Sequence, residues 1–115
     1  MPSVVIADDE TGIVETLGEI LEINEFDIVG VAHDGKHAAE LCLKFNPDFL
    51  IMDLSMPQFD GFFALEKIKN LTQTKTIVLT GVIDEEILNK LTPYTIFSLE
   101  MKPIMVSTLL KLLKP

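Results

Sequence analysis

Short apolar runs recur along the chain and are separated by stretches with a different hydrophobic spacing. Runs rich in apolar and β-branched residues predict strands. The runs are residues 3–7 (SVVIA), 26–32 (FDIVGVA), 48–52 (DFLIM), 76–80 (TIVLT) and 94–99 (YTIFSL). Because they are apolar throughout rather than alternating, they are typical of strands that are covered on both faces.

Between these runs, apolar residues recur every three or four positions, which is the spacing of one helix face. In the first such segment the face carries Ile13, Leu17, Ile20, Leu21 and Asn24. In the second segment it carries Ala38, Leu41, Cys42 and Phe45. Three further helices are expected to begin near Phe62, Asp84 and Pro103, the last because a helix tolerates proline in its first turn.

Five alternations of strand and helix predict an α/β fold, with helices on both faces of a parallel sheet. The expected architecture is (βα)5, a doubly wound five-stranded parallel sheet; if its first and third strands are neighbours, as in the flavodoxin-like strand order 2-1-3-4-5, the ends of these two strands lie together. A chain of 115 residues suits one domain, so we expect residues 1–115 to form a single unit. In such a sheet, ligands bind outside the carboxyl ends of the strands, where the strand order reverses.

Charged and polar residues stand at the ends of four expected strands. Asp8 and Asp9 follow the first strand, Asp53 follows the third, Thr80 ends the fourth and Lys102 lies just beyond the fifth. Like charges that lie close together are unfavourable unless something positive intervenes. Mg²⁺ takes one or two carboxylates, several waters and a phosphate oxygen, and a lysine ammonium suits phosphate. The pattern therefore predicts a site for Mg²⁺ and phosphate at this edge of the sheet.

Composition excludes several classes of partner. Nine basic and eighteen acidic residues give a net charge of −9, which repels nucleic acids and anionic membrane surfaces. The lone cysteine, Cys42, cannot form an internal disulfide and is expected to serve in packing. No run resembles a signal peptide, and no apolar stretch approaches the roughly 20 residues of a membrane span. We therefore expect a cytoplasmic protein without direct nucleic-acid or membrane contacts.

Four short motifs, taken in order, resemble the receiver domain of two-component response regulators. They are the pair Asp8-Asp9, the block MDLSMPQFDG at 52–61, LTG at 79–81 and KP at 102–103. Each motif is common by itself, whereas their order along the whole chain, at successive strand ends, is specific. The resemblance implies a phosphorylation-dependent signalling switch. A histidine kinase, a phosphotransfer protein or a small phosphodonor would modify it, and modification would change its binding to other proteins.

The resemblance also implies a role for the acids and their loop. Asp53 would accept the phosphoryl group, which is a form of covalent catalysis. Asp9 would bind Mg²⁺ directly and Asp8 largely through water. Asp53 and the backbone carbonyl of Ser55 would complete the protein ligands.

Thr80 and Lys102 would hold the phosphoryl oxygens, again by resemblance. In receivers the peptide bond after this lysine is commonly cis, so the Lys102-Pro103 bond is expected to be cis. The domain would be a regulatory phosphoacceptor rather than an enzyme, and it would assist its own phosphorylation and dephosphorylation.

Other interpretations of these residues remain open. Asp8 or Asp9 could cap the first helix, Thr80 could be an ordinary strand residue, and Lys102 could be a solvated lysine at a turn. A phosphatase of the haloacid-dehalogenase type also uses a strand-end acid, although it usually carries a second acid where Ser55 stands. A pseudo-receiver would bind partners without phosphorylation, but such domains tend to lose the acids, Thr80 and Lys102.

The last expected helix carries apolar residues around more than one face. These residues are Ile104, Met105, Val106, Leu109, Leu110, Leu112 and Leu113. An exposed apolar surface often marks an interface, so we expect a homodimer or an output partner to use the fourth and fifth helices. The alternative is a fully core-facing helix with Lys111 and Lys114 outward.

One position departs from the family pattern. Receivers usually place an aromatic residue three positions before the active-site lysine, and here that position is Leu99. Phe97, two residues earlier, is expected on the same face as Leu99 but about 6 to 7 Å further from the site. Leu99 has no ring to reorient, so we expect the response to be a displacement of the loop and helix around Thr80.

Overall fold

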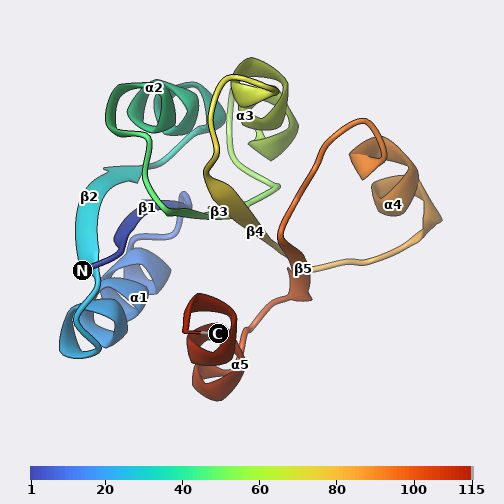
Figure 1. The fold of residues 1–115 in the computed structure, drawn as a ribbon. Helices are drawn as coiled ribbons and strands as arrows, with labels where there is room; N and C mark the ends of the chain where they lie inside the picture. Colours follow the sequence, from blue (N-terminus) through green and yellow to red (C-terminus); the bar gives the residue numbers. More distant parts are fainter. Residues whose placement is uncertain (115) are drawn as a thin grey trace.

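Five parallel strands form one sheet in the order β2-β1-β3-β4-β5, which confirms the predicted strand order. The structure is a computed structural model, and it describes residues 1–114. Helices follow the strands in strict alternation (Figure 1). The elements are β1 (Ser3–Ala7), α1 (Thr11–Ile23), β2 (Asp27–Ala32), α2 (Gly35–Phe45), β3 (Phe49–Asp53), α3 (Gly61–Ile68), β4 (Lys75–Thr80), α4 (Glu85–Leu91), β5 (Ser98–Met101) and α5 (Val106–Leu113).

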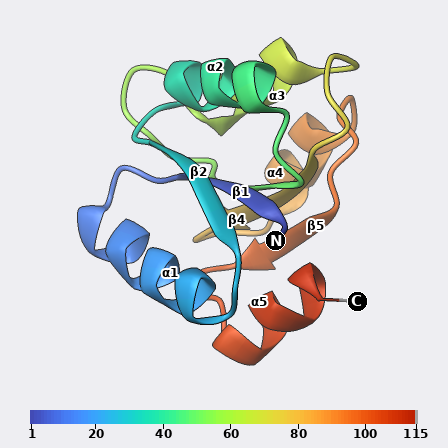
Figure 2. The ribbon, with the colours of Figure 1, turned by 60° about the vertical axis from the view of Figure 1, so that its left-hand side comes forward.

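The helices cover both faces of the sheet. Helices α1 and α5 lie on one side and α2 and α3 on the other, while α4 stands beside the edge strand β5 (Figures 1 and 2). Two apolar clusters fill the two layers. One joins α2, α3 and α4 to the sheet, and the other joins α1 and α5 to its opposite face.

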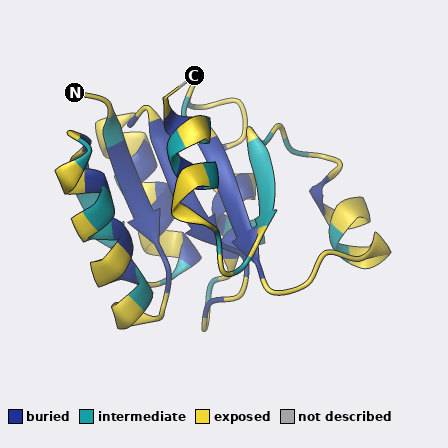
Figure 3. Cartoon of the chain, turned by 90° about the horizontal axis from the view of Figure 1, so that it is seen from below, coloured by how far each residue is buried: buried dark blue, intermediate teal, exposed yellow. Residues whose placement is uncertain are grey.

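Burial explains why the strands are apolar throughout. All five residues of β3 are buried, and so are the last four residues of β1. Figure 3 shows these central strands in dark blue and α4 largely in yellow. A strand that is covered on both faces has no solvent side on which polar residues would alternate.

The predicted boundaries are wrong in two places near the carboxyl terminus. The fifth strand is not residues 94–99 but Ser98–Met101, because its register pairs Ser98 with Ile77 and Met101 with Thr80. The last helix does not begin at Pro103 but at Val106, after an extended Met105. Ile104 packs against the cluster under α1 and α5, so the chain crosses to that face before the helix starts.

Three helices begin at an aspartate that caps them. The side chains of Asp34, Asp60 and Asp84 each accept a hydrogen bond from the backbone N–H three residues further on, at the start of α2, α3 and α4. Asp84 therefore marks the start of α4 as expected. In α1, Asn24 is not part of the helical face but follows the last residue, Ile23.

The face predicted for α2 holds except at its end. Cys42 is fully buried in the apolar cluster, which confirms its predicted packing role, whereas Phe45 is 44% exposed at the last position of the helix. Across residues 1–114, no helix combines the length and the apolar character that crossing a membrane requires.

Candidate functional site

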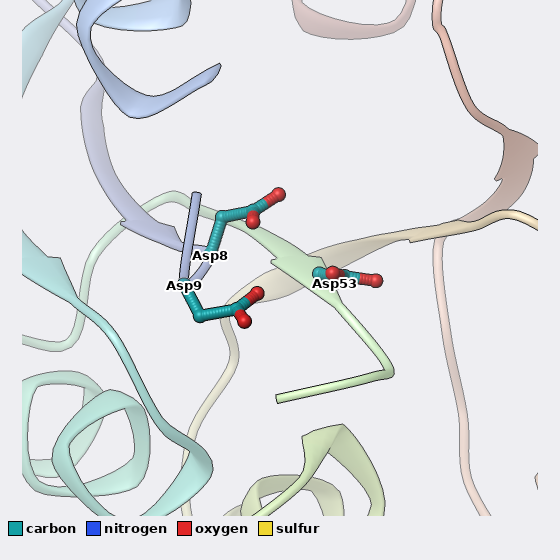
Figure 4. A group of neighbouring side chains, drawn as sticks. All are labelled: Asp8, Asp9 and Asp53. Atoms are coloured by element: carbon teal, nitrogen blue, oxygen red, sulfur yellow. The ribbon is translucent and has the colours of Figure 1, made fainter. Parts of the chain in front are cut away.

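Three aspartates meet at the carboxyl edge of the sheet. Asp8 and Asp9 follow β1, and Asp53 is the last residue of β3. The register pairs Ala7 with Met52, so the residues that follow them leave the sheet side by side. One carboxylate oxygen from each aspartate lies within 4.8 Å of the others, and Figure 4 shows the three side chains at the neighbouring ends of β1 and β3. The predicted grouping of the acids is therefore present.

Asp53 is buried, and each of its carboxylate oxygens has one hydrogen-bond partner. Its side chain is 7% exposed; Oδ1 accepts a hydrogen bond from the Ser55 N–H at 3.2 Å, and Oδ2 accepts one from Lys102 Nζ at 3.1 Å. Behind it, Gly61 packs so tightly that a Cβ there would lie 2.8 Å from the Asp53 carbonyl oxygen. Glycine at position 61 thus lets the chain turn directly beneath the acid.

Asp8 is still more buried, and one of its oxygens has a single partner. Oδ1 accepts a hydrogen bond from the Glu10 N–H at 2.9 Å. Oδ2 lies 2.8 Å from Lys102 Nζ as an ion pair and has no other polar partner within residues 1–114. Neither Asp8 nor Asp9 caps α1, because the N-cap residue is Glu10 and Asp8 bonds to the N–H of Glu10 itself rather than to an N–H of the first helical turn. The helix-cap interpretation of these acids is therefore wrong.

Lys102 connects the acids of two strands. Its ammonium contacts both Asp8 and Asp53, and it lies 3.9 Å from the exposed Glu10. Burial by itself lowers the pKa of Lys102, but the contacts with Asp8 and Asp53 outweigh that effect and hold the pKa above its ordinary value. Lys102 is therefore charged at neutral pH and is not the solvated turn residue of the alternative interpretation. The Lys102-Pro103 peptide bond is cis, as predicted.

Thr80 is buried at the end of β4, and its hydroxyl bonds to the loop that follows. Thr80 Oγ1 donates to the Val82 carbonyl at 3.0 Å and accepts from the Val82 N–H at 3.3 Å. The Thr80 carbonyl accepts from the Lys102 N–H at 2.8 Å. Thr80 thus lies between the loop before α4 and the strand end that carries Lys102.

The donor set suits a hard divalent cation. Asp8, Asp9 and Asp53 supply oxygen atoms, and Ser55 lies two residues beyond Asp53 on the loop 54–60, with an exposed side chain. Three carboxylates and one ammonium leave an excess of two negative charges, which a divalent cation would cancel. The single-partner oxygen of Asp8 also retains capacity to accept. Oxygen ligands with spare negative charge are those that Mg²⁺ prefers.

The sequence did not indicate that two residues, His33 and Gly35, lie near the site. His33 is exposed, and its Nδ1 lies 2.9 Å from the Asp8 carbonyl oxygen. Gly35 donates its N–H to the Phe59 carbonyl at 2.6 Å. Both residues lie beyond β2, and only the predicted strand order could have placed them near β1 and β3.

Comparison with known proteins shows the class of protein to which this fold and this cluster of acids belong. The chain belongs to the response regulator receiver domain family, whose model matches residues 4–114. It is 34% identical over 107 residues to the transcriptional regulatory protein PdtaR of Mycobacterium tuberculosis, covering 93% of this chain and 52% of that protein. It is 30% identical over 83 residues to the chemotaxis protein CheY of Bacillus subtilis, covering 72% of this chain and 69% of that protein.

Solved structures show the same fold. The signal receiver domain of a modulated diguanylate cyclase from Desulfovibrio desulfuricans superposes with a TM-score of 0.88 at 23% identity, covering 99% of this chain and 91% of that one. A CheX–CheY complex from Borrelia burgdorferi superposes with a TM-score of 0.87 at 24% identity, covering 96% of this chain and 85% of that one.

Membership of the family carries general properties to this chain. Receiver domains are regulatory domains of phosphorylation-dependent signalling, and they bind Mg²⁺ at an acidic pocket such as the one that Asp8, Asp9 and Asp53 form here. The chain spans about half the length of the first curated relative, PdtaR.

Proposed function

We propose that Asp53 accepts a phosphoryl group in a Mg²⁺-dependent reaction and that the phosphorylated domain changes its binding to other proteins. The observation that carries this proposal is the environment of Asp53. Its buried carboxylate lies 3.1 Å from the Lys102 ammonium and within 4.8 Å of the other two carboxylates. A carboxylate in such a cluster can act as a nucleophile towards phosphorus.

The proposed reaction needs only a phosphodonor and, for its reversal, water. A carboxylate oxygen of Asp53 forms a bond to phosphorus, while the bond from phosphorus to the donor breaks and its electron pair leaves with the donor. Asp53 then carries a mixed anhydride, and attack of water on phosphorus returns the carboxylate and releases phosphate. Lys102 stabilises the charge on the phosphoryl oxygens throughout. In this sense the domain assists its own phosphorylation and dephosphorylation.

We assign the Mg²⁺ ligands to Asp9, Asp53 and the carbonyl of Ser55, with Asp8 acting largely through water. Mg²⁺, when bound, supplies positive charge that offsets the carboxylates and the phosphoryl oxygens. The exposed Asp9 is free to turn towards a cation, whereas Asp8 is already engaged by Lys102 and by the Glu10 N–H. This difference supports direct ligation by Asp9.

Transmission of the signal begins at Thr80. A phosphoryl group adds nearly two negative charges and strong acceptor oxygens beside Asp53. A hydroxyl that turns to donate to one of them gives up its bond to the Val82 carbonyl, so the loop 81–84 is released from its present position. Helix α4 follows this loop, and the population of its positions shifts with phosphorylation.

A histidine kinase or a phosphotransfer protein is the donor that the family membership suggests. For the output partner, or a second copy of the chain, we propose the surface of α4 and α5. Exposed apolar residues in these helices are Leu88 and Val106, and those in the segments that flank the helices are Val82, Ile83, Met101 and Met105. Leu109 and Leu113 of α5 are buried, so the helix contributes both to the core and to this surface.

Intact-mass spectrometry after incubation with a small acyl phosphate tests the proposal. We expect one added phosphoryl group that appears with Mg²⁺, is absent with a chelator, and is removed by hydroxylamine. Equal modification with and without the metal would show that the acidic cluster does not serve this reaction.

A further inference from the structure

The turn between β2 and α2, residues 32–35, contacts both segments that carry the proposed metal ligands. One segment is the pair Asp8-Asp9, and the other is the loop 54–60, which carries Ser55. The turn itself supplies no carboxylate to the cluster. We propose that this turn is the positioning element of the metal site, setting the separation of the two segments and thereby the affinity for Mg²⁺. The inference rests on the proposed function above.

The first contact fixes the backbone at Asp8. His33 Nδ1 lies 2.9 Å from the Asp8 carbonyl oxygen. Because a carbonyl oxygen can only accept, Nδ1 carries the proton and donates. The Asp8 N–H in turn donates to the Ala32 carbonyl at 3.0 Å. Both polar backbone groups of Asp8 are therefore bonded to the same turn, which determines where Asp9 leaves the end of β1.

The second contact fixes the loop 54–60. The Gly35 N–H donates to the Phe59 carbonyl at 2.6 Å. A Cβ at Gly35 would overlap the Asp60 carbonyl oxygen and lie 2.9 Å from the carbonyl carbon. Any side chain there would push the loop away from α2. The obstacle is backbone, so it cannot be relieved by a rotamer change.

The two ends of the loop are joined to each other. The Gly61 N–H donates to the Leu54 carbonyl at 2.9 Å, and a Cβ at Gly61 would lie 2.9 Å from the Leu54 Cα. The chain is therefore closed on itself between Leu54 and Gly61, with Ser55 at the start of the closed loop. A push at Asp60 moves the loop as a body relative to Asp8 and Asp9.

Mg²⁺ makes the site sensitive to such shifts. It requires near-ideal octahedral geometry with ligand distances of about 2.0 to 2.1 Å. Groups that orient the ligands typically change metal affinity by about 10- to 100-fold when they are removed. His33 and Gly35 act through Asp8 and the loop respectively, so we regard them as positioning residues.

The test is a Mg²⁺ titration of the unphosphorylated protein, followed by NMR amide shifts of residues 8–10 and 53–56. We expect His33→Ala and Gly35→Ala to weaken binding by about 10-fold each. Two matched variants serve as controls. His37→Ala removes an exposed histidine on the first turn of α2, and Gly12→Ala adds a Cβ where nothing lies within 4 Å. Both controls should bind Mg²⁺ as the wild type does.

A conservative variant separates positioning from general stability. The side-chain amide nitrogen of asparagine is bonded to Cγ, as histidine Nδ1 is, so His33→Asn can still donate to the Asp8 carbonyl. We expect it to restore most of the affinity that His33→Ala loses, while urea unfolding monitors the stability of every variant. The histidine pair decides the test even if Gly35→Ala does not fold.

If the wild type binds Mg²⁺ normally and His33→Ala binds it with unchanged affinity, this inference is overturned but the proposed function is not. Loss of affinity in the His37→Ala control to the same extent would also overturn the inference. A wild type without Mg²⁺-dependent shifts around Asp53 would overturn both the inference and the proposed function. The two failures are therefore distinguishable.

Discussion

Lys102 Nζ lies 3.1 Å from Asp53 Oδ2, although the two residues are 49 positions apart in the sequence. The same ammonium lies 2.8 Å from Asp8 Oδ2. One cation from the end of β5 thus holds the carboxylates of β1 and β3 together. In the unphosphorylated protein without metal it is their counter-ion. Its removal should therefore lower the stability of the fold most when Mg²⁺ is absent.

We predict that Lys102→Met lowers the free energy of unfolding by about 2 to 3 kcal/mol in a chelator, because two buried carboxylates lose their charge partner. Addition of Mg²⁺ should raise the free energy of unfolding more in Lys102→Met than in the wild type. Urea unfolding with and without Mg²⁺ measures both effects. Lys111→Met, which changes an exposed lysine of α5, is the control. Equal effects of the two variants in the chelator would contradict the counter-ion role.

The two neighbouring acids should differ in their effect on metal binding. We expect Asp9→Ala to weaken Mg²⁺ binding more than Asp8→Ala, because Asp9 is exposed and unengaged while Asp8 is held by Lys102 and Glu10. Isothermal titration calorimetry of both variants checks the order. Equal losses would argue against direct ligation by Asp9.

Leu99 provides a prediction about the response. Its side chain is half-buried and packs against the cluster under α2 and α3. Phe97 does not share its face as expected, because it precedes β5 and its ring packs edge-on against Phe49, a member of the opposite cluster. Phe97 is therefore not placed to take over the aromatic residue's motion when Thr80 turns.

On binding a phosphoryl analogue, we expect the largest amide shifts in residues 80–91 and only a small change at the Leu99 methyl groups. Methyl NMR of the free and analogue-bound protein measures this, and Thr80→Ala should blunt the shifts in 81–91 while leaving phosphorylation largely intact. A large rotamer change at Leu99 that disappears in Thr80→Ala would show that leucine performs the aromatic residue's task.

Cys42 provides a test of core packing. Burial raises the pKa of its thiol from 9.0 to about 12. In the folded protein it should not react with an aromatic disulfide reagent at pH 8, whereas in denaturant it should react at once.

The same shift predicts a pH dependence of stability. Between pH 9.0 and about 12 the unfolded thiol ionises and the folded one does not. The contribution of Cys42 to stability is thus complete below pH 9.0 and is lost as the pH rises, by up to about 1.4 kcal/mol per pH unit. Cys42→Ala should lack this part of the decline, and identical slopes in the two proteins would contradict the buried thiol.

The hydrophobic pattern was sufficient for the alternation of strands and helices, and the flavodoxin-like order 2-1-3-4-5 then predicted the grouping of the acids. Asp8, Asp53 and Lys102 each stand directly at a strand end, and parallel strands bring such ends to one edge. The pattern gave the wrong start for β5, because apolar residues also occur in the segment that precedes this strand. Residues 94–97 are apolar and β-branched, yet only the register with β4 decides that the strand begins at Ser98.

The supporting contacts could not be predicted for a related reason. The bond from His33 to the Asp8 carbonyl involves a backbone acceptor, which every residue offers, so no residue type in the sequence marks it. The contact between Gly35 and the Asp60 backbone likewise depends on the distance between two loops from different strands. In the sequence alone, Gly35 is indistinguishable from an ordinary first residue of a helix.

Peptide mapping of the phosphorylated protein tests the central claim most directly. After incubation with a small acyl phosphate and Mg²⁺, the protein is mapped by mass spectrometry beside Asp53→Asn and the control Asp27→Asn, which changes an exposed acid at the start of β2. We expect one phosphoryl group, located at Asp53 in the wild type and the control, and none in Asp53→Asn. Undiminished modification of Asp53→Asn would contradict the assignment of Asp53 as the phosphoacceptor.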